Sequence, residues 1–145
     1  MSDLTLAVVH HLIAFALVAV VLAELLYLQP NLDAAAVRRI GRVDAWYGIL
    51  AGAILLVGFG RAVFAAKGWD YYAGNAFFWG KMVTFVTIGL LSVPPTLAYI
   101  KWRKGGIAPS AQQVNKVKRF LVLELLLFAP LIAFAAAMAR GFGMR

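Results

Sequence analysis

Six side chains that could hold a redox cofactor are spread along this sequence. They are His10, His11, Arg61, Lys81, Met82 and Met138. Imidazole nitrogen and thioether sulfur are axial ligands of haem iron, while guanidinium and ammonium groups neutralise carboxylates such as the haem propionates. This set is compatible with a haem b site. There His10 would be the axial ligand of the iron, His11 or a Met sulfur could complete the coordination, and Arg61 and Lys81 would hold the propionates.

Acidic side chains form a second set of candidates. Glu24, Asp44 and Glu124 each lie in or beside a long apolar run. Ionisable residues inside membrane spans usually face the interior of a bundle and mark proton or ion pathways. With Tyr47, these acids could line an interior polar path. The alternative is that they form salt bridges with Arg39, Arg42 or Lys118.

Four long apolar runs carry these residues. Apolar residues make up 63% of the chain and charged residues only 14%, against about 25% charged residues in soluble proteins. A helix needs about 20 apolar residues to cross the hydrocarbon core, and residues 4–28, 45–66, 77–100 and 120–139 meet this length. The sequence therefore predicts an all-α protein, an antiparallel four-helix transmembrane bundle, with residues 1–145 forming a single membrane domain. The first run lacks a basic segment before it and is too long for a signal peptide, so we expect it to be a mature helix.

Basic residues are unequally divided between the connectors. Nine basic residues lie in the connector between the first and second runs or in the connector between the third and fourth runs. Only four lie at the middle connector and the C-terminus. The positive-inside rule then predicts both termini outside, in the cytoplasmic membrane. These basic residues lie in short segments next to the spans and not in a separate domain, so the sequence does not indicate nucleic-acid binding. The aromatic residues beside the connectors are expected to anchor the spans at the membrane interface. This group includes Trp46, Trp69, Trp79, Tyr99 and Trp102.

Depth along the spans separates the two sets. His10, Arg61, Lys81 and the two methionines are expected near the outer ends, and the acids near the cytoplasmic side. At about 100° per residue, Glu24 is about 40° from His10 around the helix and about 140° from His11. His10 and Glu24 therefore share a stripe, which predicts that His10 faces the interior and His11 the lipid.

Several alternatives remain open. His10 could merely hydrogen-bond a neighbouring helix while Arg61 and Lys81 extend to the headgroups. A transition-metal site is weakly supported, because adjacent histidines project about 100° apart and the chain has no cysteine. Nor is there a Ser, His and Asp set at one depth. A small transporter or channel, or a membrane assembly partner without chemistry, would also fit. Small residues at Gly48, Ala51 and Gly52 could support self-association.

Four segments of the sequence resemble an uncharacterised bacterial family of four-helix predicted membrane proteins. They are VVHHLIAFALVAVVLAELLYL, RRIGRVDAWYGILAGAILLVGFGRAVFAAKGWDYYAGNAFFWGKM, GLLSVPPT and MARGFG. The resemblance covers nearly the whole chain and implies an inner-membrane location without implying an activity. The positions carried over are His10, His11, Glu24, Asp44, Tyr47, Gly48, Arg61, Lys67, Tyr71, Tyr72, Asn75, Phe78, Lys81, Ser92, Pro95 and Thr96.

More distantly, the order of features is similar to that of HemJ-type protoporphyrinogen oxidases and copper-resistance D membrane proteins. The shared features are an early His, a Gly-rich second helix ending in Arg61, and a third helix opening with an aromatic residue and Lys81. This resemblance implies haem b, with a quinone or porphyrin-type molecule as partner. The chain departs from such proteins in having no His after His11. We therefore expect a haem b-binding membrane redox protein in contact with lipid.

Overall fold

The computed structural model describes residues 3–64 and 68–144, and nearly all of them are helical. The helices are α1 (Asp3–Tyr27), α2 (Ala34–Phe64), α3 (Gly68–Ala73), α4 (Ala76–Gly105) and α5 (Ala111–Ala139). All except the short α3 are long and apolar enough to cross a membrane. The all-α class and the four long apolar helices are therefore confirmed, and within the described residues the structure has no β-strand.

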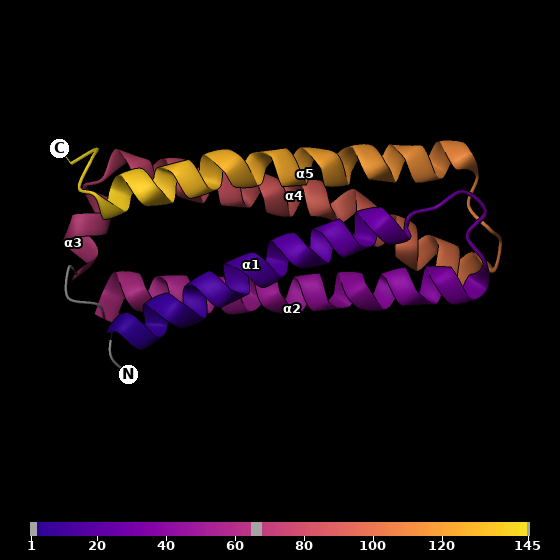
Figure 1. The fold of residues 1–145 in the computed structure, drawn as a ribbon, viewed down its shortest axis with the longest axis horizontal. Helices are drawn as coiled ribbons and strands as arrows, with labels where there is room; N and C mark the ends of the chain where they lie inside the picture. Colours follow the sequence, from indigo (N-terminus) through magenta and orange to yellow (C-terminus); the bar gives the residue numbers. More distant parts are fainter. Residues whose placement is uncertain (1–2, 65–67, 145) are drawn as a thin grey trace.

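The four long helices lie side by side along the molecule, and each reverses the direction of the one before it (Figure 1). Helix α1 packs on α2 and α5, and α4 packs on the same two helices, so α1 and α4 are diagonal neighbours. Helix α1 is tilted across the others. Near its N-terminus it lies beside α2, and near its C-terminus it approaches α5 (Figure 1). We call the end that carries α3 the α3 end, and the opposite end the basic end.

Three of the long helices extend beyond the ranges expected from hydropathy. α2 begins at Ala34 rather than residue 45, α4 ends at Gly105 rather than residue 100, and α5 begins at Ala111 rather than residue 120. The added turns are basic and lie outside the apolar runs. Hydropathy finds only the part of a helix that suits hydrocarbon, whereas the helix itself continues until a cap or turn ends it. Ala65, Ala66 and Lys67 lie outside the described residues.

Local signals explain where these extended helices begin and end. The Asp33 carboxylate accepts a 2.7 Å hydrogen bond from the amide of Ala36 at the start of α2. Ser110 and Gln113 form a capping box at the start of α5. Gly106 ends α4 in the left-handed conformation, with φ of 61°, which glycine adopts without steric cost. α4 and α5 continue through Pro94, Pro95 and Pro130.

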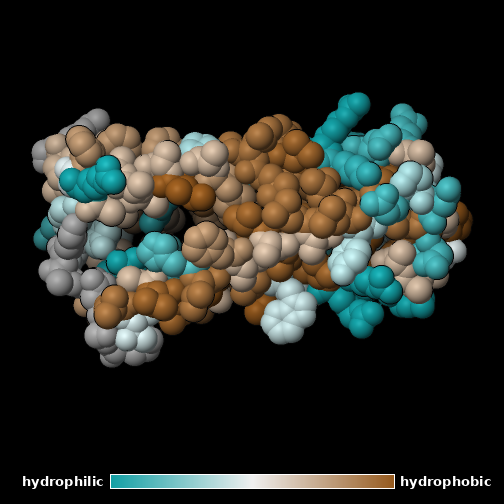
Figure 2. Space-filling view, viewed as in Figure 1, coloured by the Kyte–Doolittle hydropathy of each residue, from teal (hydrophilic) through white to brown (hydrophobic). Residues whose placement is uncertain are grey.

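The surface shows the same division as the sequence. The middle of the molecule is apolar and the basic end is hydrophilic (Figure 2). Trp46, Trp69 and Trp79 are exposed, as expected of interface anchors, but the expectation for Tyr99 and Trp102 is wrong: they are 2% and 7% exposed and belong to the core. Their position near a span end indicated an anchor, but both side chains point between helices rather than towards headgroups.

Candidate functional site

A cavity opens at the α3 end of the bundle. It has two adjoining lobes of about 280 and 210 Å³. The larger, apolar lobe runs along Leu55, Phe85 and Leu131, and the smaller lobe, which we call the α3 lobe, is closed by Tyr71 and Tyr72. The tilt of α1 separates its N-terminal half from α5 (Figure 1), and the surface is hollowed there (Figure 2). The helix surfaces beside this hollow are largely apolar (Figure 2).

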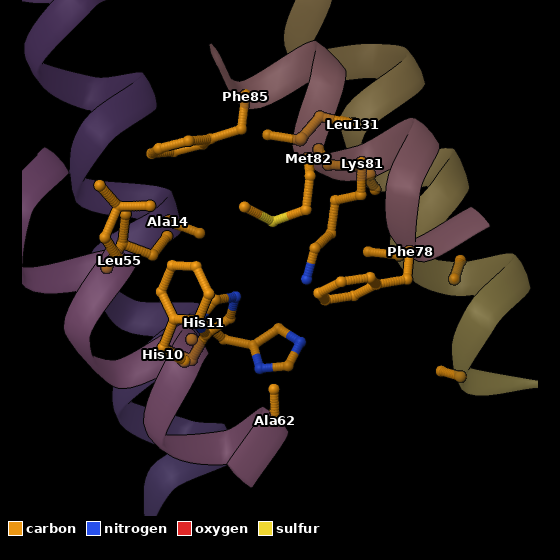
Figure 3. Close-up of a pocket in the computed structure, with 17 residues that line it drawn as sticks. His10, His11, Ala14, Leu55, Ala62, Phe78, Lys81, Met82, Phe85 and Leu131 are labelled. Atoms are coloured by element: carbon orange, nitrogen blue, oxygen red, sulfur yellow. The ribbon is translucent and has the colours of Figure 1, made fainter. Parts of the chain in front are cut away.

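All six residues that the sequence offered as cofactor ligands line this cavity. His10, His11 and Lys81 line both lobes, Met82 lines the apolar lobe, and Arg61 and Met138 line the α3 lobe. They come from α1, α2, α4 and α5, so the bundle gathers groups that are far apart in sequence. Figure 3 shows the two histidines on one side of the cavity and Lys81 and Met82 on the other.

The two histidines have different surroundings. His10 is half-buried and His11 is exposed, in the arrangement that the helical phase predicts. The His10 ring packs on α2 at Gly58, where a Cβ atom would lie 3.5 Å from Cε1 of the ring. Its Nδ1 is enclosed without a hydrogen-bond partner in the described structure. His11 Nδ1 instead lies 2.7 Å from the carbonyl oxygen of Ala7 in its own helix.

On the opposite wall, α4 presents a cation and a sulfur atom. The Lys81 ammonium lies 5.6 Å from the centroid of the Phe78 ring, a distance typical of a cation–π contact. Phe78 is itself buried with Ala62 and Tyr72, and Met82 and Met138 pack against this small apolar cluster. Lys81 and Met82 are thus held on a rigid wall and both face the cavity.

Positive charge is concentrated in the cavity. The Lys81 ammonium and the Arg61 guanidinium both line the α3 lobe, and no described Asp or Glu lines either lobe. Like charges in a partly desolvated site repel, and a negatively charged group placed between them relieves that repulsion. The α3 lobe therefore suits an anionic group, while the adjoining lobe suits an apolar body.

The α3 lobe is closed by a segment that sequence reasoning did not connect to it. The Tyr71 hydroxyl donates a 3.2 Å hydrogen bond to the carbonyl oxygen of Met138. Asn75, which is fully buried, caps α4 through Oδ1 and donates from Nδ2 to the carbonyl oxygen of Phe142. The segment after α5 is thereby fastened over the start of α4. A polar Asn between two aromatic runs was the available signal, but its partner could not be read from sequence.

The acidic candidates meet in the other half of the bundle. Glu24 and Glu124 are 2% and 1% exposed, and Asp44 is half-buried. Tyr99 donates a 3.0 Å hydrogen bond to Glu24, and Thr96 donates a 2.7 Å hydrogen bond to Asp44. The Tyr47 hydroxyl lies beside the Glu124 carboxyl. Salt bridges with Arg39, Arg42 or Lys118, the alternative that the sequence left open, are not seen among the described residues, where hydroxyl groups are the partners of Glu24 and Asp44.

An apolar layer separates the acids from the cavity. It consists of the buried side chains Leu17, Val21, Ile54, Ile88 and Phe128. The His10 and Glu24 sets are therefore two sites rather than one continuous polar path in this structure. Within residues 3–64 and 68–144 no group of three or more His, Cys, Asp or Glu side chains is placed to hold a metal ion.

Comparison with known proteins places the chain in a family but gives no activity. The family described as "Predicted membrane protein (DUF2214)" matches residues 2–143. No curated protein and no solved structure matches the chain, so the distant resemblance to HemJ-type and copper-resistance D proteins stays a prediction. Because the match covers nearly the full length, this chain of four long apolar helices belongs to the DUF2214 family of predicted membrane proteins.

Proposed function

We propose that the protein binds haem b in the cavity at the α3 end and acts in electron transfer or a related oxidation. The observation that carries this proposal is the composition of the cavity walls. His10 and Met82 face a largely apolar cavity from different helices, and Lys81 and Arg61 stand at its polar end. Haem b has the matching properties of an iron that takes imidazole and thioether ligands, an apolar ring, and two propionates.

The residues present fit this group. Nδ1 of the His10 ring is enclosed, and Nε2 would be the nitrogen for iron ligation. Met82 would be the second ligand from α4, and Lys81 and Arg61 would pair with the propionates. When bound, haem b would supply one-electron chemistry. An entrance between apolar helix surfaces would suit a ligand that partitions into the bilayer, and the same entrance would admit a quinone or porphyrin-type electron donor.

The reduced-minus-oxidised absorption spectrum tests this proposal. The protein would be produced in haem-replete bacterial cells and purified in mild detergent. We expect Soret and α bands in the wild type, their loss in His10→Ala, and their retention in His11→Ala, because His11 is exposed and bonded within its own helix. Met82→Leu should keep the pigment but shift its bands. A colourless wild-type protein, or an unchanged spectrum in His10→Ala, would overturn the proposal.

We also propose the arrangement in the membrane: an antiparallel bundle in the bacterial cytoplasmic membrane, with both termini outside. The nine basic residues that lie at the basic end support this orientation. Gly48 and Gly52 face open space on α2, which leaves room for a second copy. Fusions at the C-terminus test the orientation. Alkaline phosphatase should be active there and green fluorescent protein dark, and the reverse result would exclude it.

A further inference from the structure

The acidic group at the basic end carries an inference independent of haem. We propose that Glu24, Asp44 and Glu124 form a proton-binding site inside the bundle, in which the two glutamates hold their protons at neutral pH. This site differs from the cavity in location, residues and chemistry, and the apolar layer lies between them.

The two glutamate side chains are buried next to other acidic side chains. Glu24 and Glu124 are almost completely enclosed by four helices. Asp44 and Glu124 lie within charge-interaction range of Glu24, and Asp44 lies within that range of Glu124. An ionised carboxylate is costly to bury unless a cation pairs with it. Three neighbouring carboxylates would add mutual repulsion to that cost, and proton uptake removes both.

Hydroxyl groups of tyrosine and threonine surround the carboxyls. Each of the four long helices contributes to this group of side chains. Glu24 comes from α1, Asp44 and Tyr47 from α2, Thr96 and Tyr99 from α4, and Glu124 from α5. The tyrosine and threonine partners are hydroxyls, which can donate to a carboxyl oxygen and also accept from a protonated carboxyl. Such a network accommodates a proton without requiring an ion pair.

One oxygen of the Glu124 carboxyl has no hydrogen-bond partner in the described structure. This atom is Oε1, and it is buried in a residue that is 1% exposed. Buried polar atoms are rarely left without a partner. The Glu124 carboxyl lies within charge-interaction range of Glu24 and Asp44, and a proton on this carboxyl removes the charge that makes it costly to bury.

The sequence permits an unusually direct test. Glu24 and Glu124 are the only glutamates in the chain. Cell-free synthesis with glutamate carrying ¹³C in its side-chain carboxyl therefore labels these two groups in the unaltered protein. We expect an isotope-shifted infrared carbonyl band of protonated carboxyl at pH 7 in phosphatidylcholine nanodiscs, replaced by a carboxylate band only under alkaline conditions. Two carboxylate bands at pH 7 would overturn the proposal.

Variants assign the band to each residue. Glu24→Gln and Glu124→Gln should each remove about half of the labelled carbonyl band. Asp33→Asn should leave it unchanged, because Asp33 is exposed at the start of α2. A labelled band that persists in full in both glutamate variants would also contradict the site. The samples are prepared without haem, so a failure of the haem proposal would leave this result unaffected.

Discussion

The Tyr99 hydroxyl on α4 donates a hydrogen bond of 3.0 Å to Oε2 of Glu24 on α1. These helices lie diagonally across the bundle, since each packs on α2 and α5. Both side chains are 2% exposed. The bond therefore crosses the centre of the bundle and fixes the C-terminal half of α1, the half that approaches α5, while the N-terminal half tilts away and leaves the cavity open.

Tyr99→Phe should destabilise the protein by about 1 kcal/mol. The change leaves a buried acceptor unsatisfied, which costs roughly 1–3 kcal/mol in soluble proteins and less between membrane helices. Unfolding in mixed detergent and dodecyl sulfate, followed by circular dichroism, measures the difference. The matched control is Tyr27→Phe, which removes a phenol oxygen from a side chain that is 41% exposed. Equal unfolding free energies for the two variants would refute a structural role of the bond.

The sequence predicts the parts of this architecture that depend on one helix at a time. Run lengths identify four spans, and the phase of α1 distinguishes His10 from His11, because both follow from helix geometry and hydrophobicity. The depth of each polar residue in its span also indicates which groups meet. His10, Lys81 and Arg61 line one cavity, and Glu24 lies near Glu124.

Features that depend on how helices pack could not be read in this way. The tilt of α1, which opens the cavity, arises from contacts with α2 and α5 together. Tyr99 was expected at the interface because span-end tyrosines often lie there; whether such a ring turns inwards depends on the partner opposite, here Glu24. The closure at the α3 end of the bundle joins Asn75 to Phe142, residues whose separation in sequence gives no sign of contact.

Asn75 has two separable roles, and a pair of variants distinguishes them. Its Oδ1 accepts from the amides of Phe77 and Phe78, while its Nδ2 donates to the carbonyl oxygen of Phe142. Asn75→Asp keeps the cap but loses the donor, and Asn75→Ala loses both. We expect Asn75→Ala to reduce stability by about 1 kcal/mol more, the usual contribution of an N-cap.

In both variants residues 140–144 should become more accessible to hydrogen exchange, because the bond to Phe142 is lost in each. The amides of the first turn of α4 should lose protection only in Asn75→Ala. Equal exchange of that turn in the two variants would show that the cap is not what orders it.

Gly143→Ala should disrupt the same closure more strongly than Gly141→Ala. Both glycines have positive φ, at 83° and 82°, so the backbone strain added by a side chain is similar. A Cβ at Gly143 would clash with Cδ2 of the Phe77 ring, whereas nothing lies within 4 Å at Gly141. Hydrogen exchange at the Ala76 amide, which donates to the Gly143 carbonyl, measures the closure. We expect faster exchange by at least a factor of about ten in Gly143→Ala, which corresponds to about 1.4 kcal/mol. Identical exchange in the two variants would contradict the packing against Phe77.

The apolar layer between the two sites predicts that the protein is not a proton channel. Its members Leu17, Val21, Ile54, Ile88 and Phe128 are at most 7% exposed, and none can relay a proton. In phosphatidylcholine vesicles with a potassium gradient and valinomycin, an internal pH dye should report the same steady proton flux as in protein-free vesicles. A flux above that background, abolished by Glu24→Gln, would show that the two sites are connected and favour the transporter alternative.

Filling the cavity should exclude haem without unfolding the bundle. Ala135 on α5 lines both lobes, so Ala135→Phe places a ring in the space proposed for the cofactor. The added side chain enters a cavity rather than a close-packed core, and we expect the unfolding free energy to change by less than about 1 kcal/mol.

Ala133→Phe is the matched control, because Ala133 is exposed on the same helix and lines neither lobe. The ratio of the Soret band to the protein band should fall sharply in Ala135→Phe and stay at the wild-type value in Ala133→Phe. Full pigment in both variants would place any bound haem outside this cavity.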